Sequence, residues 1–134
     1  YSVGNQALIL QTRGDLDSAM ALHKEQEQIC RELGNKKGLS ISLGNQALIL
    51  QARGDLDSAM ALHKEQEQLC REQGNKHGLQ ASLGSQAILF ANLGHVKQAM
   101  LLIEEAMQLS RELGMPAAIE QNQKVLDFVR SKLN

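Results

Sequence analysis

Two histidines and two cysteines are the residues of this sequence whose types and spacing could do chemistry. His23 and Cys30 are seven residues apart, and His63 and Cys70 repeat this pair 40 residues later. Imidazole and thiolate groups are the usual ligands of zinc. On a helix, however, seven residues correspond to about 10 Å along the axis, which is too far for one ion to bind both side chains. We therefore expect no metal site and no cofactor, and we interpret both histidines as core residues.

The two cysteines occupy equivalent positions of a repeated segment, and this position bears on whether they can form a disulfide. Equivalent helices that pack side by side lie about 8–10 Å apart. A disulfide requires Cα atoms within about 7 Å. Cys30 and Cys70 are therefore predicted to be buried free thiols in a reducing compartment, which favours a cytoplasmic protein. His77 and His95 lack the repeated pattern and are expected at the surface.

The charged and hydroxyl residues do not form a catalytic set. Glu27 and Arg31 lie four residues apart, the spacing of an ion pair on a solvated helix face. The glycines are spaced as helix ends rather than as a phosphate-binding loop, and Ser18 and Ser58 belong to duplicated helix starts. We predict that the protein is not an enzyme.

Composition excludes two further classes of partner. The 14 basic and 15 acidic residues give a net charge of -1, and aromatic residues make up 2% of the chain. Nucleic-acid binding therefore lacks both a basic surface and stacking side chains, and no apolar run is long enough to span a membrane. The 134 residues suit a single domain, 1–134, and the start at Tyr1 suggests a fragment of a longer array.

An internal repeat determines the expected fold. Residues 4–43 and 44–83 align without gaps and differ at six of 40 positions, and a third, divergent copy occupies 84–123. A period of 40 with two regularly placed glycines is typical of two helices per repeat. The sequence therefore predicts an all-α, right-handed α-solenoid of three helix-turn-helix repeats with a C-terminal capping helix.

Turn residues locate the helices. Gly54 and Gly74 fit helix ends, Asp55 and Asn75 fit the N-caps that follow, and Pro116 fits the first turn of a last helix. The first helix of a repeat (helix A) is expected at 36–53 and 76–93, the second (helix B) at 15–33, 55–73 and 95–113, and the capping helix at about 116–132.

The small and apolar residues of each repeat resemble those of a known family. Ala47, Gly54, Leu56 and Ala59 follow the skeleton of tetratricopeptide (TPR) repeats, and the 40-residue period is similar to that of Partner-of-Inscuteable-like and kinesin-light-chain-like repeats. The resemblance implies a non-catalytic scaffold for protein–protein interaction.

The chain departs from that family at Gln6, Gln46 and Gln86, where a leucine is usual. A buried glutamine without hydrogen-bond partners costs about 1–3 kcal/mol. We expect these side chains either to form a ladder across the repeats or to lie at the edge of the helix interface in contact with water.

In TPR arrays helix A lines the concave surface, so the resemblance implies a binding surface here, which we call the helix-A face. Asparagine and glutamine can bind a peptide backbone because an amide both donates and accepts hydrogen bonds. An alternative remains open, in which Gly44 serves helix packing and the asparagines are merely solvated. The predicted contact residues are Asn5, Leu8, Gln11, Asn45, Leu48, Gln51, Ser85, Ile88 and Asn92.

Two functions follow from these observations. The first is a scaffold that binds a peptide or helical segment of a partner protein along the helix-A face. The second is a self-associating structural module, a homo-oligomer formed by stacking or swapping through its uncapped N-terminal repeat.

Overall fold

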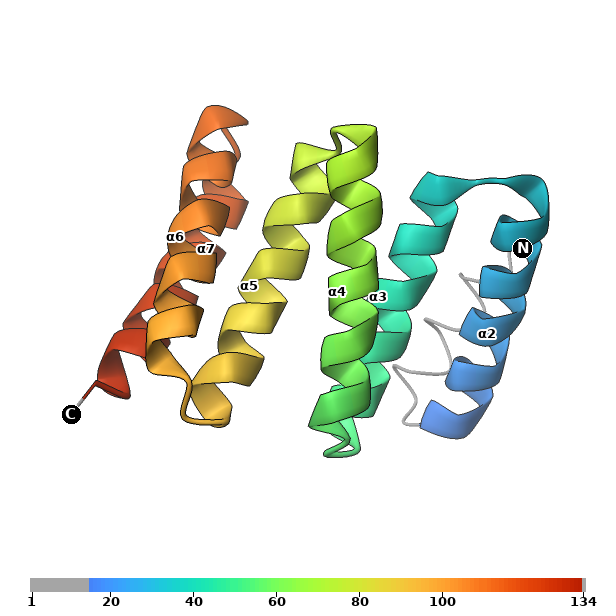
Figure 1. Ribbon diagram of the computed structural model, residues 1–134, viewed down its shortest axis with the longest axis horizontal. Helices are drawn as coiled ribbons and strands as arrows, with labels where there is room; N and C mark the ends of the chain where they lie inside the picture. Colours follow the sequence, from blue (N-terminus) through green and yellow to red (C-terminus); the bar gives the residue numbers. More distant parts are fainter. Residues whose placement is uncertain (1–14, 134) are drawn as a thin grey trace. The chain divides into compact units, whose positions relative to one another are not determined.

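The computed structural model describes residues 15–133, and their regular structure is entirely α-helical (Figure 1). Each predicted helix within this range is present, with ends that agree to within one residue. The predicted all-α fold of paired helices is therefore confirmed, while the first helix A of the array lies outside the described residues. The helices are α2 (Leu16–Leu33), α3 (Lys36–Ala52), α4 (Leu56–Gln73), α5 (Lys76–Asn92), α6 (Val96–Glu112) and α7 (Pro116–Ser131).

The turns between the helices use the residues that the sequence indicated. Gly54 and Gly74 have φ angles of 83° and 65°, left-handed values that only glycine adopts at little cost. Asp55 then caps α4, since its Oδ1 accepts a hydrogen bond from the backbone N–H of Ser58 at 3.2 Å. Asn75 caps α5 by accepting from the N–H of Gly78 at 3.0 Å. These local contacts fix where each helix begins and ends.

The chain forms two compact units, residues 1–69 and 70–134, and the boundary lies within α4. In the first unit, Leu62 and Leu69 of α4 pack against a buried cluster of Cys30, Leu39 and Leu43. In the second unit, α5, α6 and α7 all contact one another around one apolar core. Its fully buried members include Leu83, Ala87, Ala99, Ile103 and Val129.

Gly44 illustrates how closely the helices approach. A Cβ atom at this position would lie 2.5 Å from Nε2 of Gln66, inside the distance that real Cβ atoms keep. Ala47 and Ala59, which are fully buried, likewise allow α3 and α4 to pack closely. The amide end of Gln66 would have to move to admit a side chain here, and this close approach agrees with the interpretation that Gly44 serves helix packing.

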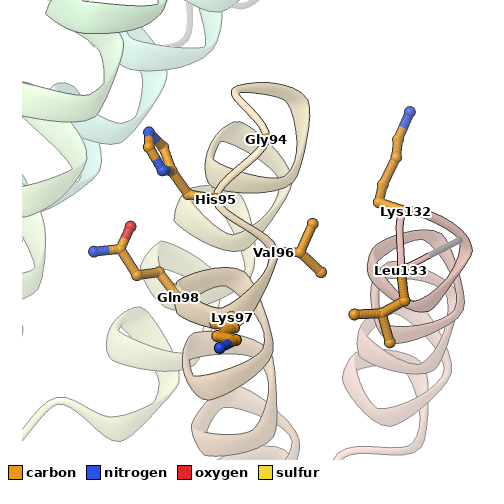
Figure 2. Close-up of a pocket in the computed structure, with 7 residues that line it drawn as sticks. All are labelled: Gly94, His95, Val96, Lys97, Gln98, Lys132 and Leu133. Atoms are coloured by element: carbon orange, nitrogen blue, oxygen red, sulfur yellow. The ribbon is translucent and has the colours of Figure 1, made fainter.

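The start of α6 differs from the starts of α2 and α4. Asp15 and Asp55 accept hydrogen bonds from the first turns of their helices, but His95 at the equivalent position makes no side-chain cap. Figure 2 shows His95 beside Val96 and Gln98. Lys132 and Leu133, which follow the last residue of α7, lie across an open hollow of about 720 Å³. The first turn of α6 therefore lacks the side-chain acceptor that Asp15 and Asp55 provide for α2 and α4.

Replacing His95 with aspartate is expected to stabilise the second unit. The new carboxylate can accept from the first turn of α6, as Asp55 does in α4, which contributes about 0.5–2 kcal/mol to the free energy of unfolding. The substitution also removes the edge-to-face contact between the rings of His95 and Phe90, whose centroids are 6.0 Å apart, and this loss reduces the gain in part. Urea denaturation measures the change.

His95→Asn is the matched control, because asparagine supplies the hydrogen bond without the charge. If neither variant is more stable than the wild-type chain, the missing cap has no energetic consequence and this explanation is wrong.

Candidate functional site

The residues predicted for the helix-A face are distributed over both units. Asn5, Leu8 and Gln11 lie outside the described residues. On α3 in the first unit, Leu48 is 48% exposed, whereas Asn45 and Gln51 are half-buried. On α5 in the second unit, Ser85 and Ile88 are half-buried and Asn92 is exposed.

A groove between α5 and α7, of about 230 Å³, contains two of these residues. We call it the α5–α7 groove. Helix α5 contributes Gln80, Ala81, Gly84, Ser85 and Ile88. Helix α7 contributes Ala118, Gln121, Asn122 and Val125. The structure thus brings Ser85 and Ile88 together with α7, while Asn92, at the C-terminal end of α5, does not line the groove.

Sequence reasoning missed the α7 side of this groove, although a signal for it exists. Helix α7 begins at Pro116, one period of 40 residues after Lys76, where α5 begins. It therefore occupies the place of a fourth helix A, and Ala118 corresponds to Gly78. Aligning the capping helix with the repeats would have placed these residues beside α5.

Asn122 fixes the base of the groove. Its side chain is 4% exposed, and its Nδ2 donates to Oε1 of Gln80 at 3.0 Å and to the carbonyl of Ala106 at 3.2 Å. These two bonds connect α7 to both α5 and α6. A Cβ on Gly84 would lie 3.3 Å from Oδ1 of Asn122, so a larger residue there would press on this network.

The lining of the α5–α7 groove is neutral. Its polar members are amides and a hydroxyl, and the others are small or apolar side chains, without an acidic or basic residue among those that line it. Such a surface can exchange hydrogen bonds with a peptide backbone and accept a small apolar side chain, whereas it offers no group suited to general acid–base or nucleophilic chemistry.

Two of the four histidines, His23 and His63, are core residues, as predicted. His23 and His63 are 0% and 2% exposed. Burial lowers the pKa of both imidazoles, and the hydrogen bond between His63 Nδ1 and Gln66 Oε1, at 3.3 Å, only partly opposes this shift. Cys30 and Cys70 are buried free thiols, which also agrees with the prediction. Within residues 15–133, histidine, cysteine and carboxylate side chains do not gather into a group that could hold a metal ion.

Gln46 satisfies its amide within its own unit. It is buried, and its Nε2 donates to Oε1 of Glu27 at 2.9 Å and, at longer distance, to the hydroxyl of Ser42. Gln86 is also buried and donates to Ser82 at 3.3 Å, whereas Gln6 lies outside the described residues. The expected position at a water-exposed edge is therefore wrong for Gln46 and Gln86. A carboxylate of α2 and a hydroxyl of α3 bind the amide of Gln46, and a hydroxyl one turn earlier in α5 binds that of Gln86.

Two ion pairs between helices B were also missed by sequence reasoning. Arg31 donates to Glu65 at 3.0 Å in the first unit, and Arg71 donates to both carboxylate oxygens of Glu105 at 3.1 Å in the second. Both pairs join residues that are 34 positions apart, and Arg71 and Glu105 follow Arg31 and Glu65 by one period of 40. The repeat could therefore have been used to predict the second ion pair from the first. The predicted pair within one helix is present, with 2.8 Å between Arg31 and Glu27.

Comparisons with known proteins support the repeat assignment. The family described as anaphase-promoting complex subunit 5 matches two overlapping segments, residues 16–85 and 53–120. No curated protein sequence matches the chain. In the part of the chain that the structure describes, no helix is long and apolar enough to cross a membrane.

Among solved structures, the crystal structure of BtubC (BKLC) from P. vanneervenii is similar, with a TM-score of 0.87 and 16% sequence identity. The match covers 98% of this chain and 55% of that chain, so the present sequence spans about half of the protein it resembles. At this identity the likeness shows the fold alone, a TPR-like α-solenoid, as predicted. The chain therefore belongs to the family described as anaphase-promoting complex subunit 5, a family of TPR-type repeats.

Proposed function

We propose that this chain is a non-catalytic scaffold for protein–protein interaction that binds a peptide or helical segment of a partner along the helix-A face. The observation that carries the proposal is the α5–α7 groove, where Ser85 and Ile88 meet the neutral residues of α7. TPR-type repeats and their fold support the general role. The groove is the part of the helix-A face that we propose for this role.

The chemistry of the groove indicates what part of a partner it would bind. Gln121, which is exposed, and the half-buried Ser85 can donate to and accept from a peptide backbone. Ile88, Ala81 and Ala118 can contact an apolar side chain. A volume of about 230 Å³ is below the range of drug-sized sites and suits a single side chain of an extended segment.

Blocking the groove is expected to abolish binding. Peptides selected by display against the wild-type chain provide the ligands, and their affinity is then measured for Ala118→Arg. The arginine would fill the groove and add a charge to its neutral lining, which should weaken binding at least about tenfold.

Ala117→Arg is the matched control, since Ala117 is exposed on the same turn of α7 and does not line the groove. Selected peptides that bind the Ala117→Arg and Ala118→Arg variants equally well would contradict the proposal for this surface. Circular dichroism of both variants checks that each remains helical.

Self-association is the alternative that the sequence left open. It depends on the N-terminal repeat, whose first helix lies outside the described residues. Light scattering over a concentration series tests it, because a mass that rises with concentration supports it and a constant mass of 14.7 kDa opposes it. A cytoplasmic location remains a proposal that the free cysteines support.

A further inference from the structure

The first unit contains a second concave surface, which we call the α2–α4 hollow. Residues of α2, α3 and α4 line its volume of about 410 Å³. Met20, Leu50 and Leu62 provide apolar surface, and Ala61 lies at the edge on α4. This size and this predominantly apolar lining are typical of sites that enclose part of a ligand.

The α2–α4 hollow is separate from the helix-A face. Gln46 and Leu50, which α3 contributes to the hollow, are four residues apart and so lie on one side of that helix. Leu48 lies about 200° around the helix axis from each of them. The same helix therefore presents the predicted contact residue Leu48 and the hollow on nearly opposite sides.

The charged side chains that line the hollow have one sign. The two charged residues that line it are Lys24 and Arg53, both cations. Arg53 forms an ion pair with Asp17. The exposed ammonium group of Lys24 has no ion pair within the described part of the chain. A carboxylate next to an apolar group would therefore find both an unpaired cation and an apolar cavity here.

The third repeat shows which side chains would fill such a hollow. The residues equivalent to Leu50 and Ala61, one period of 40 later, are Phe90 and Leu101. Phe90 packs against the core of the second unit, so helix A accepts the larger ring at this position. The chain itself therefore supplies two substitutions that would reduce the hollow while keeping residue types that the fold accommodates.

We propose that the α2–α4 hollow is a docking site for a segment of a partner protein in which a large apolar side chain is flanked by aspartate or glutamate. The apolar side chain occupies the space over Met20, Leu50 and Leu62, and the carboxylate pairs with Lys24. Apolar anchors in pockets contribute most of the binding energy of interfaces, and a peripheral charge pair adds selectivity for the acidic segment. The site is independent of the α5–α7 groove.

Two short peptides of opposite charge test this proposal. Methyl groups of Met20, Leu50 and Leu62 in the ¹³C-labelled chain report on the hollow by NMR during titration with acetyl-Glu-Leu-Leu-Glu-amide or acetyl-Lys-Leu-Leu-Lys-amide. We expect the acidic peptide to shift these methyl signals and to bind at least about fivefold more tightly than the basic one. Lys24→Glu should abolish or invert this preference.

The double variant Leu50→Phe/Ala61→Leu should lose the response to the acidic peptide, followed at the methyls of Met20 and Leu62. Ala118→Arg, which blocks the α5–α7 groove, should keep it, so the two sites can fail separately. Absence of shifts at these methyls with the acidic peptide, or equal binding of both peptides, would overturn the proposal. If the double variant does not fold, the outcome for Lys24→Glu decides.

Discussion

Replacing His23 and His63 with isoleucine is expected to remove the acid sensitivity of the first unit. Burial lowers the pKa of both imidazoles in the folded state below the value of 6.5 in an unfolded chain. As the pH falls below 6.5, the unfolded state binds protons that the folded state does not, so the free energy of unfolding decreases. The contribution of the two neutral histidines to the free energy of unfolding is complete above pH 6.5, and it is lost as the pH falls toward their folded-state pKa values.

The third repeat supplies the substitution and a natural comparison. Ile103 occupies the position equivalent to His63 and is fully buried in the second unit. Hydrogen exchange between pH 7 and pH 5 should therefore show that amides of α2 and α3 lose protection before those of α6. In the double isoleucine variant the two units should respond alike over this range.

His77→Ile makes the same replacement on the surface, where His77 is exposed, and tests whether the effect requires burial. If the wild-type chain and the double variant respond equally to acid, the buried histidines are not responsible.

Truncating Ile103 to alanine is expected to cause a large loss of stability in the second unit. The side chain is fully buried within the cluster that includes Leu83, Ala99 and Val129. Removing a buried isoleucine to alanine costs about 2–5 kcal/mol, because apolar contacts are lost and the cavity closes only in part. Against a total stability of roughly 5–15 kcal/mol, this is a large fraction.

Leu101→Ala is the matched control on the same helix, since Leu101 is 70% exposed. Urea denaturation followed by circular dichroism should show a change within about 0.5 kcal/mol for this variant. Equal losses for the Ile103 and Leu101 variants would mean that the second unit does not depend on the core described here.

Much of the fold could be predicted because its determinants are local or periodic. Gly54 and Gly74 mark helix ends through their own backbone conformation, and Asp55 and Asn75 cap the next helices through contacts three residues away. The burial of His63 followed from its place in the apolar stripe of helix B. Such features can be predicted without knowing which helices pack against one another.

The functional surfaces were harder to predict because they depend on pairs of helices. Ser85 and Ile88 were chosen from the helix-A pattern, but their neighbour Gln121 comes from a helix interpreted only as a cap. The partner of Gln46 proved to be Glu27, a residue of α2 whose charge had been assigned to an ion pair. Helical periodicity gives the face on which a residue lies, and it does not give the side chain opposite.

Binding at the α5–α7 groove is the central claim, and amide chemical-shift mapping tests it most directly. The ¹⁵N-labelled chain is titrated with a peptide selected against it, and the shifted signals are assigned to residues. The largest changes are expected at Ser85, Ile88, Ala118 and Gln121. Saturable binding whose changes avoid both α5 and α7 would contradict it.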